Sequence, residues 1–381
     1  RLSSNINRLR IVSHFSGPSH FTLQLPVFHF QGSRYHQYTM AQEYASKQPS
    51  GFQNYIKNVA IVGGGGQSGK FTTEALLKAG KFQVTAITRV GSKSKLPDGV
   101  IAKEVNYESH ESLVEGLKGQ DCLVITLSVA SPPETQNNLV KAAAEAKVPW
   151  VLPNEWGGDS SNKETVKDTL IGLRKQVERD YIESLGGISW IGVACSFWYE
   201  YSLAAGPQNY GFDIKNQRAI FFDEGTARLN TTTWPQVGRA VANLLSLKVL
   251  PEDENDQSVV LSQWRNKFVR VSSFNVNQKE MFESLKRVTG TNDSDWKINY
   301  ESSKERHVSG KAEMQKGNRL GFVKMLYSRT FYADEPNNFQ ASGGDDNEKL
   351  GLPTEELDEA TNVAVQMEKD GYFEQMRSSN H

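Results

Sequence analysis

The fold is decided by residues 57–80, KNVAIVGGGGQSGKFTTEALLKAG, in which an apolar segment runs through four glycines into an amphipathic segment. Residues 57–63 are apolar without alternation, which is typical of a strand buried on both faces of a parallel sheet. Residues 71–79 have helical spacing and stop at a glycine. The glycines between fit the spacing GxxGxxG at Gly63, Gly66 and Gly69. A strand, a glycine turn and a helix in this order predict a site for the pyrophosphate of a dinucleotide.

The alternation of strands and helices continues beyond this turn. Apolar segments predict further strands at 82–88, 101–105, 121–127, 150–152 and 188–194. Segments with helical spacing lie between them at 109–117, 136–146 and 164–185. This order indicates a parallel sheet covered on both faces, so we predict an α/β fold with a Rossmann-type doubly wound sheet. A flexible glycine linker, the alternative for the turn, would need polar flanks in place of VAIV and an amphipathic helix.

The pattern changes after about residue 200, where aromatic and turn residues crowd together. Helices are predicted at 234–247, 278–290 and 355–369, and a polar surface loop at 334–349. We therefore predict a dinucleotide-binding domain over 54–205. The remainder, 206–376, is predicted to be a smaller substrate lobe with some elements returning to the sheet.

Residues 1–39 contain no Asp or Glu, four Arg and four of the seven His. We assign 1–45 to a disordered leader or targeting extension. A translated upstream leader, with Met40 as the true start, is the favoured interpretation, and a mitochondrial transit peptide is the alternative. The third interpretation is a genuine disordered extension. The expected location is cytoplasmic, or mitochondrial if the segment is a transit peptide.

Composition excludes several classes of partner. The net charge is −1, so no general basic field attracts nucleic acid or an anionic membrane. No apolar run approaches the roughly 20 residues that span a bilayer. Two cysteines, Cys122 and Cys195, form neither a disulfide framework nor a metal motif, and the metal expectation is none. The expected partner is a small molecule, with the protein a monomer or homodimer.

The cofactor is predicted from the end of the second strand. An NAD site usually has an acid there, about 20 residues after the glycines, for the ribose 2′-hydroxyl. This chain has TRVGSKSK at 88–95, in which Arg89 and Lys95 would pair with a 2′-phosphate instead. A solvated basic loop is the alternative. We predict NADPH, bound by Arg89, Lys95 and the turn residues, which are Gly63, Gly66, Gln67, Ser68 and Gly69.

Other chemistries have little support in the sequence. Beyond Met40 the chain has three histidines, without the paired spacing of a metal site or the setting of a hydrolase triad. The pattern Tyr-x-x-x-Lys occurs once, at Tyr300–Lys304. About one such match is expected by chance, and this one lies beyond the alternating region, so we assign it no role.

Three motifs carry a resemblance to a known family. They are Gly63–Gly69, the segment PNEWG at 153–157, and Lys175-x-x-x-Arg179 followed by Tyr181-Ile182-Glu183. Together they resemble the isoflavone-reductase-like or NmrA-like family, an atypical branch of the short-chain dehydrogenases. The segments SFWYEYSLA (196–204), TTTWPQVGRAVANLLSL (231–247) and LGLPTEELDEAT (350–361) resemble a fungal subgroup of the concanamycin-induced-protein type.

The resemblance covers about residues 45–376 and implies specific roles. It implies a Rossmann NADP domain with a small C-terminal lobe, and reduction of aromatic substrates such as isoflavones, lignans and benzyl ethers. By position, Lys175 matches the catalytic lysine, Arg179 a cofactor contact, and Arg89 the 2′-phosphate arginine. The chain departs from the family pattern where Gly65 replaces Thr, Ser68 replaces an apolar residue and Asn154 replaces Ser.

Helical periodicity tests the place of Lys175. An apolar stripe at Leu170, Leu173, Val177, Tyr181 and Leu185 is expected to pack on the sheet. Lys175 lies roughly 140–160° from that stripe, at 100° per residue, on a face of mixed polarity. A cleft wall would explain the mixture, and an ordinary surface lysine is the alternative. Aromatic residues that follow the last strand are candidate substrate walls, with core packing as an equal alternative; they are Phe197, Trp198, Tyr199 and Tyr201.

The function predicted from the sequence is an NADPH-dependent reductase that transfers hydride to a small, aromatic, electrophilic substrate. Lys175 is its general acid or base. The main alternative is a non-catalytic, NADP(H)-sensing regulator of NmrA type. A nucleotide-sugar epimerase or dehydratase is a third reading, which the lack of an in-register Tyr-x-x-x-Lys disfavours.

Overall fold

A computed structural model describes residues 42–128, 131–161, 163–169 and 172–378. Of the leader predicted over 1–45, residues 1–41 lie outside these residues. The body of the chain, Glu43–His381, forms one compact unit. Its first turn, η1 (Ala45–Lys47), is attached to this body, because the backbone amide of Ala45 donates to the carbonyl of Pro251 at 2.9 Å.

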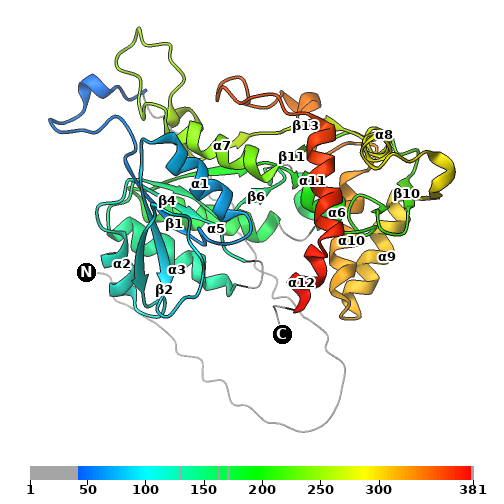
Figure 1. Cartoon of the computed structure of the whole chain (residues 1–381). Helices are drawn as coiled ribbons and strands as arrows, with labels where there is room; N and C mark the ends of the chain where they lie inside the picture. Colours follow the sequence, from blue (N-terminus) through cyan, green and yellow to red (C-terminus); the bar gives the residue numbers. More distant parts are fainter. Residues whose placement is uncertain (1–41, 129–130, 162, 170–171, 379–381) are drawn as a thin grey trace, which may run out of the picture. The chain divides into compact units, whose positions relative to one another are not determined.

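The centre of the body is a sheet in which every pairing is parallel (Figure 1). The strand order is β12-β7-β5-β4-β1-β2-β3, and β6 pairs with β7. The predicted doubly wound Rossmann-type sheet is confirmed. The strands are β1 (Asn58–Val62), β2 (Gln83–Arg89), β3 (Ile101–Val105), β4 (Cys122–Ile125), β5 (Trp150–Leu152), β6 (Trp156–Gly157), β7 (Ser189–Ala194) and β12 (Lys267–Arg270).

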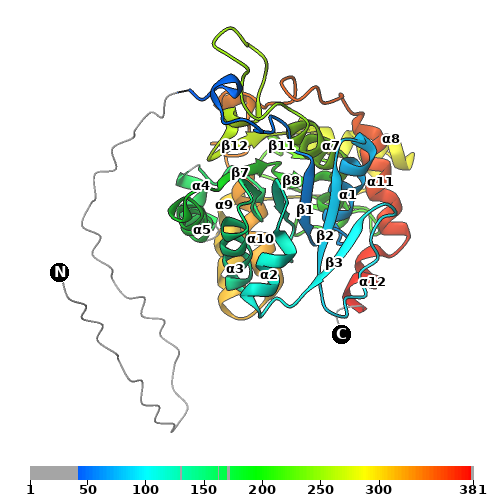
Figure 2. The same ribbon diagram turned by 90° about the vertical axis from the view of Figure 1, so that its left-hand side faces the viewer.

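Helices cover both faces of the sheet, as the uninterrupted apolar strands predict (Figure 2). In β1, Val59 and Ile61 face one apolar core while Ala60 and Val62 face another. The first core lies under α1 (Gly69–Ala79) and α7 (Trp234–Leu245). The second lies under α2 (His110–Leu117), α3 (Pro133–Glu145) and α5 (Gly172–Leu185).

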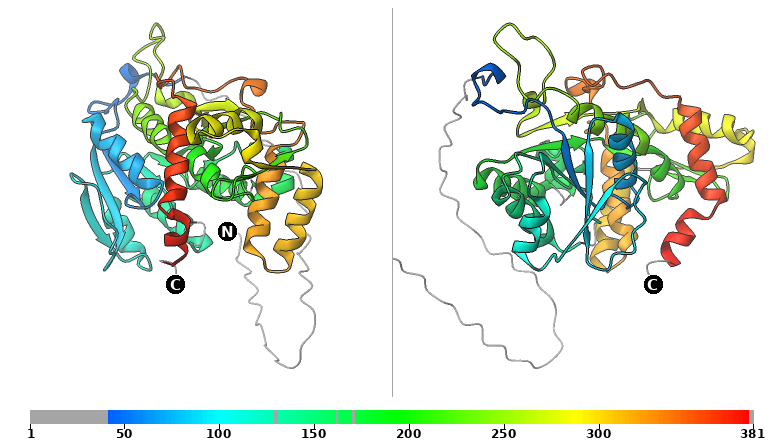
Figure 3. Two further views of the ribbon diagram at one scale, coloured as in Figure 1. Left: turned by 45° about the vertical axis from the view of Figure 1, so that its right-hand side comes forward. Right: turned by 60° about the vertical axis from the view of Figure 1, so that its left-hand side comes forward.

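The second half of the chain builds a third apolar core of its own, with two small sheets ordered β14-β10-β9 and β13-β11-β8. Figure 3 shows its long helices, among them the packed pair α9 and α10. One strand of this half, β12, leaves the lobe and joins the main sheet beside β7. The elements are β8 (Phe197–Trp198), α6 (Tyr199–Ala204), β9 (Phe212–Asp213), β10 (Arg218–Phe222), β11 (Leu229–Thr232), β13 (Phe274–Val276), α8 (Gln278–Thr289), β14 (Lys297–Glu301), α9 (Ser303–Gln315), α10 (Arg319–Thr330), α11 (Leu357–Lys369) and α12 (Tyr372–Ser378), with short 3₁₀ turns η2 (Leu261–Trp264), η3 (Asp293–Asp295) and η4 (Gln340–Ser342).

The predicted helix over 164–185 is wrong in two respects. It forms two helices, α4 (Lys163–Thr169) and α5, separated by residues outside the described part of the chain. The centre of the predicted apolar stripe does not pack on the sheet, because Leu173 is 70% and Val177 60% exposed. Leu185 at its end does pack against the second core, and Leu170 lies outside the described residues. The buried face of α5 carries Glu178, Arg179 and Ile182 instead. Two of these are charged, so a pattern that counts only apolar residues selects the wrong face.

No helix among the described residues is both long enough and apolar enough to cross a membrane.

Candidate active site

The glycine turn connects β1 to α1, and two of the three glycines in the GxxGxxG spacing, Gly63 and Gly69, are required by contact. A Cβ at Gly63, where φ is +76°, would overlap the carbonyl oxygen of Thr126, which follows β4. A Cβ at Gly69 would overlap the carbonyl oxygen of Gly63. A side chain at either position would force the turn away from the neighbouring strand or separate helix from strand.

The middle glycine leaves the turn open toward solvent. Gly66 is exposed, and a Cβ there would come only to 3.0 Å from the carbonyl oxygen of Gly63. Within the described residues, no acceptor is found for the backbone amides of Gln67, Ser68 and Gly69, which begin α1. Free amides at a helix N-terminus attract anions, so this backbone fits a pyrophosphate.

The end of β2 brings two basic side chains beside this turn. The register pairs Val62 with Ile87, so Arg89 lies where the glycine turn begins. Lys95 is adjacent, since a Cβ at Gly65 would overlap the Lys95 carbonyl oxygen. Both side chains are exposed. Burial raises the pKa of Tyr107 to about 12, and the nearby Arg89 guanidinium opposes that rise.

This turn lies where the direction of strand order reverses. The chain runs from β1 through β2 to β3, then crosses to β4 on the other side of β1. In open α/β sheets, ligands bind beyond the carboxyl ends of the strands at such a reversal. The predicted turn residues, Arg89 and Lys95 are therefore together at the edge where this fold binds ligands.

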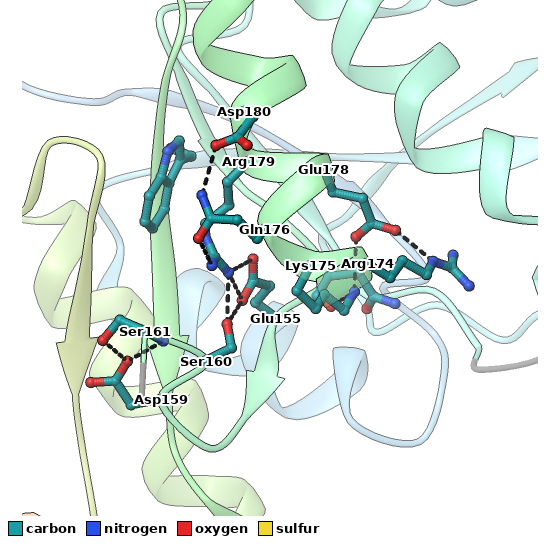
Figure 4. A network of polar contacts seen from close by, with 12 residues as sticks. Glu155, Asp159, Ser160, Ser161, Arg174, Lys175, Gln176, Glu178, Arg179 and Asp180 are labelled. Atoms are coloured by element: carbon teal, nitrogen blue, oxygen red, sulfur yellow. Dashed lines mark hydrogen bonds and ion pairs between the residues drawn. The ribbon is translucent and has the colours of Figure 1, made fainter. Parts of the chain in front are cut away.

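Lys175 of α5 reaches the same edge of the sheet. Its Nζ donates to the carbonyl oxygen of Asn154, just after β5, at 2.8 Å, and lies 3.1 Å from a carboxylate oxygen of Glu178. The Lys175 side chain is 18% exposed, so its amine is neither free in solvent nor sealed in the core. Figure 4 shows Lys175 and Glu178 on the same helix, pointing toward each other.

Hydrogen bonds of two side-chain amides, those of Asn154 and Gln136, hold the partners of Lys175 in place. The Asn154 side chain pairs with both backbone groups of Leu127, each at 3.1 Å, and its backbone amide donates to Gln136 at 2.7 Å. Gln136 in turn donates to Glu178 at 2.8 Å. Leu127 directly follows Thr126, which touches Gly63. These hydrogen bonds therefore connect the lysine to the glycine turn.

Arg179, the predicted cofactor contact, binds other side chains of the protein instead. Its Nη1 lies 2.8 Å from both carboxylate oxygens of Glu155 and donates to Ser160 at 2.6 Å (Figure 4). Its guanidinium also packs 5.4 Å from the ring centre of Trp190. Arg179 is 2% exposed, and burial raises the pKa of Glu155 while Arg179 opposes the rise. The arrangement does not support a cofactor contact; Arg179 fastens α5 to the loop after β5.

The four predicted substrate walls have different surroundings. Tyr199 is fully buried, and its hydroxyl bonds to Thr361 at 2.7 Å, so it is a core residue, which was the alternative. Phe197 stacks on Tyr327 at 4.0 Å between ring centres. Trp198 and Tyr201 are half-buried and both face Trp234. Phe197 is half-buried as well, so these three remain candidates for a wall.

Sequence reasoning missed several residues at this edge. The Tyr372 hydroxyl of α12 contacts the Gln67 side chain in the glycine turn, although 305 positions separate them. Gln136 and Glu178, which position Lys175, are ordinary helix residues by pattern. PNEWG was noted as a motif, but the backbone pairing of its Asn154 has no sequence signal.

Comparisons with known proteins agree with this geometry. Residues 56–205 match the model of the NmrA-like family. The chain is 27% identical over 311 residues to oxidoreductase aprR of Aspergillus flavus, which covers 79% of this chain and 96% of that protein. The predicted family resemblance is confirmed, and this fungal relative bears an oxidoreductase name.

Solved structures show the same fold. A structure described as AtPrR2 with NADP+ and (+)pinoresinol superposes with a TM-score of 0.63 at 18% identity, covering 82% of this chain and 100% of that one. An isoflavone reductase crystal structure gives a TM-score of 0.62 at 20% identity, covering 81% and 99%.

Proposed function

We propose that this protein is an NADPH-dependent reductase that acts on a small aromatic electrophile. The observation that carries the proposal is the glycine turn, whose amides at residues 67–69 have no acceptor within the described ranges, flanked by Arg89 and Lys95 at the switch in strand order. The oxidoreductase name of the fungal relative and the NADP+ and NADPH named for similar folds support it.

The residues of the turn fit the cofactor. The amides of Gln67, Ser68 and Gly69 would hold the pyrophosphate, and the exposed Gly66 lets it approach the backbone. Arg89 and Lys95 would bind the 2′-phosphate, because a guanidinium forms paired, charge-assisted hydrogen bonds with phosphate oxygens. Bound NADPH supplies the hydride for the electrophilic carbon.

Lys175 would supply the proton. Its ammonium has three N–H donors, of which two are engaged by Asn154 and Glu178. The third donor is available to an oxygen of the substrate, on which negative charge develops as the neighbouring carbon is reduced. Proton transfer from Lys175 to that oxygen completes the two-electron reduction. Glu178 and the Asn154 carbonyl keep the amine oriented.

The non-catalytic sensor is not favoured, since the similar proteins are oxidoreductases. A sensor should prefer oxidised dinucleotide and oxidise no NADPH with a panel of aromatic carbonyls and enones. A reductase should bind NADPH more tightly and consume it with at least one member of the panel.

Changing Arg89 to Ala should weaken NADPH binding by about 10- to 100-fold, because one to two charge-assisted hydrogen bonds are lost. Binding of NADH, which has no 2′-phosphate, should not change. Fluorescence titration of both dinucleotides measures this. Lys93→Ala, an exposed cation in the same loop, is the matched control. An equal loss for NADPH and NADH would contradict the assigned role.

A further inference from the structure

Buried polar atoms without partners are concentrated at one place beside the glycine turn. Six such side-chain atoms occur among the described residues, and four of them belong to the segment 196–200 or to Trp234. The four are Ser196 Oγ, Trp198 Nε1, Glu200 Oε2 and Trp234 Nε1. The Trp198 indole interacts with the thiol of Cys195, which leaves the other three. Because folded proteins leave few buried polar atoms unpaired, this concentration indicates a partner that is not part of the chain.

Glu200 is the most informative of these residues. It is 3% exposed, and one carboxyl oxygen accepts from the backbone amide of Trp234 at 2.8 Å, while the other has no partner in the part of the chain that the structure describes. Burial raises the pKa of Glu200 to about 7, and the nearby Glu355 acts in the same direction. Near neutral pH the carboxyl is therefore often protonated, and a protonated carboxyl can donate as well as accept.

The indole of Trp234 also carries a buried polar atom, its N–H, without a partner among the described residues. An indole N–H donates only, so its partner must be an acceptor. A donor at Trp234 and a carboxyl at Glu200 together suit an oxygen that can accept and, as a hydroxyl, also donate.

Aromatic rings surround this polar pair and connect it to the cofactor site. The Trp234 ring stacks on Phe71 at 5.5 Å between centres and faces Tyr201 at 5.7 Å. Phe71 lies in the first turn of α1, two residues after Gly69. Phe373 of α12 covers Tyr201 at 5.0 Å. The polar pair is therefore close to the place where the glycine turn begins its helix.

We propose that Glu200 and the indole of Trp234 form the polar end of a substrate subsite, which takes a planar aromatic ring carrying a hydroxyl group. The inference rests on the proposed function, because it assumes that the adjoining turn holds the dinucleotide. The ring packs among the aromatic side chains as Phe373 moves off Tyr201, and its hydroxyl exchanges hydrogen bonds with Glu200 and Trp234. Glu200 thus determines specificity, while Lys175 keeps the proton-donating role.

Binding without turnover tests the subsite. The probes are 4-hydroxychalcone and chalcone, which differ by one hydroxyl, measured by equilibrium dialysis with saturating NADP+. The wild type should prefer 4-hydroxychalcone by at least about tenfold, because chalcone leaves the buried groups unpaired. Glu200→Leu should bring the two affinities to within about twofold, and Glu200→Gln should keep part of the preference.

Gln120→Leu is the matched control, since Gln120 Oε1 is also buried and unpaired but lies outside the cluster; it should keep the wild-type preference. Equal binding of the two probes by the wild type, or an unchanged preference in Glu200→Leu, would overturn the inference. If Glu200→Leu does not fold, Glu200→Gln decides by the same ratio. Binding of NADP+ without either chalcone refutes the subsite alone, whereas no binding of NADP+ refutes the proposed function as well.

Discussion

Replacing Lys175 with Met should lower kcat by about 100- to 10,000-fold, the range for loss of a general acid. The affinity for NADPH should change by no more than about twofold, because the turn amides and Arg89 do not contact the lysine. Single-substrate kinetics at the nicotinamide absorbance, together with fluorescence titration of NADPH, measure the two quantities. The fold should persist, since Glu178 keeps its bonds to Arg174 and Gln136.

Lys141→Met, an exposed lysine on α3, is the matched control and should leave both quantities unchanged. Undiminished turnover in Lys175→Met would remove the lysine from the mechanism. A parallel loss of NADPH affinity would instead assign it to cofactor binding.

Replacing Arg179 with Leu should reduce the free energy of unfolding by about 3–5 kcal/mol, because a buried carboxylate loses its partner. Glu155 would then be buried with Ser160 alone, and its pKa should rise further above the ordinary value. A raised pKa of an acid favours folding at low pH, and that benefit disappears as the pH rises. The deficit against wild type should therefore grow as the pH rises past the pKa of Glu155 in the wild type, which is already above the ordinary 4.5, and urea unfolding at a series of pH values measures it.

Two variants delimit this prediction. Arg287→Leu breaks an exposed pair with Asp358 and should cost no more than about 1 kcal/mol. Adding Glu155→Gln to Arg179→Leu should recover part of the loss, because no buried charge remains. A deficit below 1 kcal/mol at neutral pH would show that Arg179 is not the fastening for α5.

The sheet was predictable because its signal is local. The strand at 58–62, the glycines and the helix after them each follow from a short run of residues, and neighbouring strands repeat the pattern. The helix α5 was misjudged because its buried face is polar. Glu178 and Arg179 are tolerated inside only because Gln136 and Glu155 meet them, and those residues come from other elements.

The part of the candidate site that depends on local sequence was predictable, and the part built by distant elements was not. Gly63 and Gly69 are demanded by contacts that any such turn makes, so sequence alone selects them. Arg89 follows from its position at the end of a strand. Glu200 and Tyr372 had no comparable signal, because their importance comes from elements that only folding brings together.

Strand β12 has a consequence for engineering this protein. It starts more than 70 residues after β7, yet forms the outer edge of the main sheet beside it. A chimera that exchanges everything after residue 205 would replace that edge along with the lobe built by the second half of the chain. Recombination between relatives should therefore respect two crossover points, one on each side of residues 267–270, so that the recipient keeps its own border strand.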